Sequence, residues 1–235
     1  MRLASEKMPM DDMITDSLDD RDTPSWLQGE NKAKAAQIAG HFAKIMKVLG
    51  LDLSDPHLLE TPDRVGRMYM EIFRGLDELQ EPSITNFPNS EGYSNMVIVK
   101  NIDFFSVCSH HMIPFFGKAH VAYIPGETII GLSKIARIVE FYARRPQLQE
   151  RLTDQVVGYL EGKLAPKGTM VVIEARHLCM EMRGVEKSGA LTTTSGLRGC
   201  FEDERVRDEF FDLLKTMFQI LIKLFYQLIL IMILV

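Results

Sequence analysis

Strand-like and helix-like hydrophobic patterns follow one another along the chain in an order that leaves few possible folds. Apolar residues recur with period two in some stretches and at helical spacing in others, and Gly168 marks the return from helix to strand. The predicted strands cover 96–107, 118–124, 169–179 and 190–195, and the predicted helices cover 135–142 and 148–164. This β-β-α-α-β-β order, with a hairpin on each side of a helix pair, predicts an α+β fold: an antiparallel sheet with two helices on one face. A sheet of four strands has two open edges, which invite closure by neighbouring subunits.

Two further helices are predicted before the first strand. Apolar residues at helical spacing favour a helix over 33–49, which Gly50 would end in a left-handed cap. Thr61 and Pro62 are typical of a helix start, and the helix that follows runs to about residue 74. The prolines, asparagines and glycine of 76–94 predict a loop.

Charge and hydropathy divide the 235 residues into four parts. The first 31 residues carry eight acids and three bases, which accounts for the whole net charge of −5, and they are interpreted as a mobile acidic arm. Residues 32–94 are predicted to form an N-terminal helical region, and residues 95–215 are predicted to form the domain that contains the sheet and its helix pair. Beyond the arm the charges balance, which argues against a globally basic protein that binds nucleic acid.

Residues 216–235 are an apolar tail with three open interpretations: a membrane anchor, an amphipathic packing helix, or an end that is not part of the functional domain. Lys223 disfavours the anchor, because a central lysine costs about 2.5–3.5 kcal/mol on insertion scales. Three cysteines cannot all pair within one chain, and no apolar secretory signal opens the sequence. We therefore expect a cytoplasmic protein with free, metal-bound or catalytic thiols.

The residues best suited to chemistry are the thiols and imidazoles of two short clusters. Cys-Ser-His-His at 108–111 ends a predicted strand, and a Cys-x-x-His pair brings a thiolate and an imidazole within reach of one ion. His177 and Cys179 share one face of the later predicted strand, so one can ligate while the other stands beside the metal. Two sulfurs and a nitrogen suit Zn²⁺ and leave a fourth position for water, as in catalytic zinc sites. The alternative is that the cysteines are small buried hydrophobes and the histidines belong to a loop.

A second group of residues suits an anionic or amide-bearing ligand. Ser133 is placed to cap a helix whose first turns carry Lys134 and Arg137, which is typical of a phosphate site but also of a solvated helix start. Further candidates are Arg64, Arg183, Gln149 and Glu150.

Taken together, these motifs resemble the GTP cyclohydrolase I family over roughly residues 33–215. The motifs that carry the resemblance are Glu60-Thr61-Pro62-Asp63-Arg64-Val65, Cys108-Ser109-His110-His111, Gly131-Leu132-Ser133-Lys134, Arg144-Arg145-Pro146-Gln147-Leu148-Gln149-Glu150-Arg151-Leu152-Thr153 and His177-Leu178-Cys179. The resemblance implies the tunnelling fold and a decamer of two face-to-face pentamers, with active sites built from adjoining subunits. Ser109 departs from the glutamate of many members, and the acidic arm and the apolar tail lie outside the family pattern.

The resemblance also implies a role for each candidate. The zinc ligands would be Cys108, His111 and Cys179, the proton-handling histidines His110 and His177, the residue near the ribose Ser133, the guanine-holding pair Gln149 and Glu150, and the triphosphate clamp Arg64, Lys134, Arg137 and Arg183. The implied reaction converts GTP and water to 7,8-dihydroneopterin triphosphate and formate, the first step toward folate or tetrahydrobiopterin. Two alternatives stay open: a deazaguanine nitrile reductase of the same fold, which uses a nucleophilic cysteine and NADPH without zinc, and a non-catalytic, zinc-stabilised oligomeric scaffold.

Overall fold

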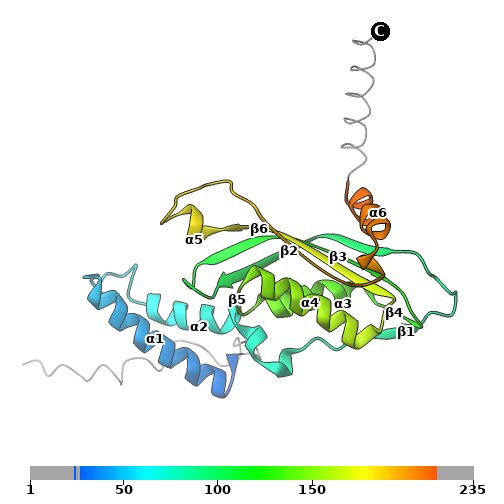
Figure 1. The fold of residues 1–235 in the computed structure, drawn as a ribbon. Coiled ribbons are helices and arrows are strands. Elements are labelled where there is room, and N and C mark those ends of the chain that lie inside the picture. Colours follow the sequence, from blue (N-terminus) through cyan, green and yellow to red (C-terminus); the bar gives the residue numbers. More distant parts are fainter. Residues whose placement is uncertain (1–23, 25–26, 216–235) are drawn as a thin grey trace, which may run out of the picture. The chain divides into compact units, whose positions relative to one another are not determined.

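The structure, a computed structural model, describes residue 24 and residues 27–215, which divide into two compact units between Leu76 and Asp77 (Figure 1). Among the described residues, the N-terminal unit contains α1 (Glu30–Val48) and α2 (Thr61–Ile72), and α2 is followed by the 3₁₀ turn Arg74–Leu76. Both predicted helices are present. Gly50 follows α1 at φ 77°, the left-handed conformation expected of it.

The second unit contains a sheet, two covering helices and several short elements. Its strands are β1 (Asn86–Pro88), β2 (Val97–Cys108), β3 (Pro114–Ile124), β4 (Thr128–Ile130), β5 (Pro146–Gln147), β6 (Gly168–His177) and β7 (Thr192–Gly199). Its helices are α3 (Leu132–Ala143), α4 (Gln149–Leu164), α5 (Leu178–Glu181) and α6 (Glu204–Leu214), with 3₁₀ turns at Glu78–Gln80 and Cys200–Glu202.

The main sheet has the strand order β5-β2-β3-β6-β7. The four long strands pair antiparallel, which confirms the predicted α+β fold. The prediction of four strands is incomplete, because the two-residue strand β5 adds a parallel partner to the end of β2. The predicted loop over 76–94 also contains β1, which pairs with β4 in a separate two-stranded sheet.

Helices α3 and α4 cover one face of the main sheet, as predicted (Figure 1). Their apolar stripes, which include Ile135, Ile138, Val156 and Leu160, pack against alternate residues of the long strands in the larger core. On the opposite face, α6 contributes Phe210 to a smaller core cluster. Among the described residues, α3 and α4 thus cover one face of the sheet, and the smaller cluster with α6 covers part of the other.

Several predictions concern residues that the structure does not describe. Most of the acidic arm and the apolar tail, 216–235, lie outside the described residues. Within residues 27–215, no helix is long and apolar enough to cross a membrane. The four-part division of the chain stays a prediction.

Candidate metal centre and active site

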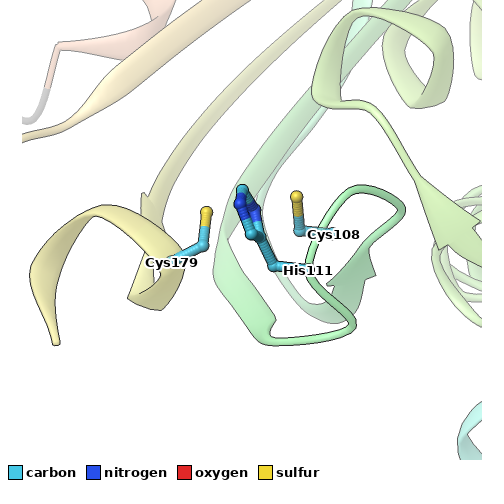
Figure 2. A group of neighbouring side chains, drawn as sticks. All are labelled: Cys108, His111 and Cys179. Carbon is cyan, nitrogen blue, oxygen red and sulfur yellow. The ribbon is translucent and has the colours of Figure 1, made fainter. Parts of the chain in front are cut away.

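The side chains of Cys108, His111 and Cys179 converge on one point at the end of the main sheet (Figure 2). Their ligand atoms, two thiol sulfurs and an imidazole nitrogen, all lie within 4.8 Å of one another. Cys108 is buried, Cys179 is half-buried and His111 is exposed. Two sulfurs and one nitrogen at this separation fit a zinc ion with one position left for water or substrate.

The tight turn between β2 and β3 positions the first two of these residues. The amide of Cys108 donates to the carbonyl of Ile113, and the amide of Met112 donates to the carbonyl of Cys108, both at 2.9 Å. Met112 takes a φ of 54°, which turns the chain back on itself. Because Ser109 also donates to the carbonyl of Gln147 at 2.9 Å, the turn is fixed to β5.

Cys108, His111 and Cys179 together form the metal group, and Cys179 belongs to it from a helix and not from a strand. The prediction of a continuous strand over 169–179 is wrong at its end, because β6 stops at His177 and Leu178–Glu181 form the short helix α5. The amide of Met182 closes this turn on the carbonyl of Leu178 at 3.0 Å. His177 and Cys179 therefore do not share a strand face, although the metal group contains Cys179 as expected.

The electrostatics of the two thiols favour a bound cation. Burial raises the pKa of the Cys179 thiol, and the neighbouring Cys108 sulfur raises it further, while the positive charge of Arg183 acts in the opposite direction. Two thiolates this close would repel each other, and a metal ion between them removes that repulsion.

His177 stands at the end of β6 in a site built by Phe115 and Gln149. Phe115 is its partner in the register of β3 and β6, and the two rings stack with centroids 4.6 Å apart and planes 3° apart. Nε2 of His177 lies 2.7 Å from Oε1 of Gln149. Burial lowers the pKa of His177, and the nearby carboxylate of Glu150 opposes this more weakly. Sequence reasoning missed Phe115, since nothing in the apolar pattern separates it from an ordinary core residue.

The other candidate residues of the second unit lie on different elements: His110 in the turn between β2 and β3, Glu150 on α4 and Ser133 at the start of α3. His110 is exposed beside His111, with ring centroids 6.2 Å apart and an edge-on angle of 83°. Glu150 is exposed in the first turn of α4. Ser133 does not cap α3 as predicted: Gly131 is the N-cap residue, and Ser133 lies exposed within the first turn.

The four basic candidates come from both units. Lys134 and Arg137 lie three residues apart on α3, and Nζ of Lys134 is 3.4 Å from Oγ of Ser83. Arg183 is exposed in the segment after α5. Arg64 belongs to α2 in the N-terminal unit, where it forms a 2.8 Å ion pair with Glu60.

Comparison with known proteins places this site in a family. The family model described as GTP cyclohydrolase I matches residues 38–215. GTP cyclohydrolase 1 of Parabacteroides distasonis is 50% identical over 179 residues, which cover 76% of this chain and 91% of the relative. The enzyme of Porphyromonas gingivalis is 48% identical over 185 residues, 79% of this chain and 96% of the relative. That of Clostridioides difficile is 46% identical over 175 residues, 74% and 92% respectively.

A solved structure, that of the archaeosine synthase QueF-Like in the apo form, aligns with a TM-score of 0.38 and 18% identity over 44% of this chain and 93% of that one. A likeness this weak carries no argument about function. The family match spans most of the chain and includes all the metal-group residues, and the curated relatives are about half identical to it along nearly their whole length. The chain therefore belongs to the GTP cyclohydrolase I family of enzymes.

Proposed function

We propose that this chain is a zinc-dependent GTP cyclohydrolase I, which converts GTP and water to 7,8-dihydroneopterin triphosphate and formate. The observation that carries the proposal is the convergence of Cys108, His111 and Cys179 within 4.8 Å, in a chain of this family. Neither alternative accounts for it as well. A nitrile reductase needs no metal, and a scaffold needs no histidine held beside the metal group.

The metal group and the two histidines divide the chemistry between them. A zinc ion held by the two thiols and the imidazole would supply Lewis-acid chemistry, which makes water a nucleophile at neutral pH. Opening the imidazole ring of guanine and releasing formate also require protons to move. His177, held on two sides, and the exposed His110 are the residues that we assign to those transfers.

The remaining candidates are assigned to the substrate by charge, by hydrogen-bonding capacity and, for Ser133, by the family resemblance. The exposed carboxylate of Glu150 can accept hydrogen bonds from the N–H groups on the edge of guanine. Ser133 is assigned to the neighbourhood of the ribose. The triphosphate would be bound by cationic side chains, which are Arg64, Lys134, Arg137 and Arg183.

We also propose that the enzyme assembles as a homodecamer, with active sites shared between subunits. The support is the edge of the main sheet, because β7 pairs on one side only among the described strands. Unpaired strand edges are a source of association between chains, and closing them around a ring satisfies their backbone groups.

Turnover of GTP with and without metal tests the proposed function. Removing metal with a chelator should abolish formation of the fluorescent pterin and of formate, and adding zinc back should restore both without NADPH. Guanosine, which lacks the triphosphate, should bind far more weakly than GTP, and salt should reduce the difference.

Each alternative gives a different result in the same assay. Full activity after complete metal removal would contradict the zinc-dependent proposal. NADPH-dependent reduction of a nitrile substrate would favour the reductase, and zinc binding without any GTP turnover would favour the scaffold.

A further inference from the structure

The side chain of Gln149 is buried and almost completely engaged by the protein itself. Only 2% of the residue is exposed. Its Nε2 lies 3.0 Å from the carbonyl oxygen of Ile173, 2.9 Å from that of Thr192 and 3.2 Å from Oγ1 of Thr194. Its Oε1 lies 2.7 Å from Nε2 of His177. The neighbouring Glu150, by contrast, is exposed.

These contacts allow only one orientation of the Gln149 amide. Backbone carbonyl oxygens accept hydrogen bonds and never donate them, so the two carbonyls of Ile173 and Thr192 require the NH₂ group on their side. If the amide were turned over, its oxygen would face both carbonyl oxygens, and three buried acceptors would lie together without a proton. Oε1 must therefore face His177.

The hydroxyl groups of Thr153 and Thr194 support the same orientation. Oγ1 of Thr153 donates to the backbone oxygen of Gln149 at 2.8 Å, and it lies 2.7 Å from Oγ1 of Thr194. Since the single proton of Thr153 is already used, Thr194 must donate to Thr153. A lone pair of Thr194 is then free to accept from the NH₂ group of Gln149.

A fixed acceptor at Oε1 determines which nitrogen of His177 carries the proton. The amide oxygen has no hydrogen, so the 2.7 Å contact requires a proton on Nε2. A neutral imidazole holds one N–H, which leaves Nδ1 without a proton and able to accept one. Stacking on Phe115 with planes 3° apart fixes the ring plane at the same time.

We infer that Gln149 is a positioning residue that holds His177 in the Nε2–H tautomer, so that Nδ1 is the atom that exchanges protons with the substrate. The catalytic meaning of this inference rests on the proposed function. It reassigns Gln149, which the family resemblance pairs with Glu150 as a guanine-holding residue, and it leaves Glu150 as the guanine contact.

Nitrogen NMR of the zinc-loaded, ¹⁵N-histidine-labelled protein tests the tautomer without any substrate. At a pH well above the ordinary histidine pKa, we expect a protonated-nitrogen shift at Nε2 of His177 and an unprotonated-nitrogen shift at Nδ1. The signals are assigned by their loss in His177→Ala. A proton on Nδ1 of His177 in the wild-type spectrum overturns the inference, whatever the variants of Gln149 and Gln147 show.

Gln149→Met then separates positioning from guanine binding. Methionine keeps the length of the side chain but offers no equivalent acceptor, so both tautomers should appear in the spectrum. We expect kcat to fall roughly 10- to 100-fold, as for other groups that orient a reactive histidine, while KM for GTP stays close to the wild-type value. A large rise in KM with kcat preserved would show that Gln149 binds guanine instead.

Gln147→Met is the matched control. Gln147 is equally buried, with 1% exposed, and its Nε2 donates to the carbonyl of Tyr142 at 2.8 Å and to Oε1 of Gln155 at 2.7 Å. This variant loses the same kind of polar contact but should keep the His177 spectrum of the wild type. If Gln147→Met altered that spectrum as Gln149→Met does, a general loss of packing order in the protein would explain both results, and the inference would fail.

A different outcome separates this inference from the proposed function. If the protein showed the Nε2–H tautomer of His177 but did not turn over GTP, the proposed function alone would be refuted.

Discussion

Each residue of the metal group supplies one of three ligand atoms, so the loss of one thiol should prevent stable zinc binding. We expect Cys179→Ser to lose bound zinc and GTP turnover together, because two protein ligands hold a catalytic zinc ion poorly. Metal analysis of the purified protein measures the first effect directly. Cys200→Ser is the control, since this half-buried cysteine lies outside the metal group and should keep its zinc. Full zinc occupancy in Cys179→Ser would remove Cys179 from the ligand set.

The sequence predicts the metal group well at this scale because ligand chemistry depends on residue type. Two cysteines and a histidine identify the group even though the predicted path of the chain to Cys179 is wrong. The position of Gln149 was harder to foresee, since a glutamine at a helix start is usually exposed. A signal was nevertheless present: Gln149 is aligned with Leu152, Val156 and Leu160 on the buried stripe of α4.

At the scale of whole elements, the close approach of β3 and β6 holds the site together. Gly117 pairs with Ala175 in this register, and a Cβ atom at Gly117 would lie only 1.8 Å from the backbone oxygen of Glu174. Backbone cannot move aside as a flexible side chain can. Since the same two strands carry Phe115 and His177, any separation here also disturbs the stacked pair.

We therefore expect Gly117→Ala to lower the free energy of unfolding by about 2–4 kcal/mol. Gly158→Ala in α4 is the matched control, because a Cβ atom there has no described atom within 4 Å. Replacing glycine by alanine inside a helix should raise stability by about 0.5–1 kcal/mol. Thermal unfolding of the two zinc-loaded variants compares them, and an unchanged midpoint for Gly117→Ala would show that β3 and β6 can separate at little cost.

Long elements could be predicted from the sequence and short ones could not. The four long strands and the helices α3 and α4 each show several repeats of their period, which is enough to identify them. The two residues of β5 show no period at all, and β1 and β4 exist only because they pair with each other. The error at Ser133 has a similar origin: a residue suited to capping does not fix the helix start when the preceding glycine can take that position.

On the scale of the whole molecule, the incomplete pairing of the main sheet points to association. Among the described strands, β7 pairs only with β6, and β5 covers β2 only at Val107 and Cys108. Both edges of the described sheet thus have unpaired backbone groups with which a strand of another chain can pair. A ring of subunits joined edge to edge satisfies these groups, and two rings face to face give the decamer proposed above.

The apolar tail tests whether the ring depends on anything outside the family core. A chain truncated after Lys215 keeps every described strand and helix, as well as the whole segment that matches the family, so it should still form a large ring and turn over GTP. Mass measurement in solution, by light scattering or sedimentation, checks the assembly, and pterin fluorescence checks the activity. A truncated protein that is monomeric yet active would contradict the shared-site proposal, because one chain would then hold a complete site. A truncated protein that dissociates and loses activity would show instead that the tail is part of the assembly.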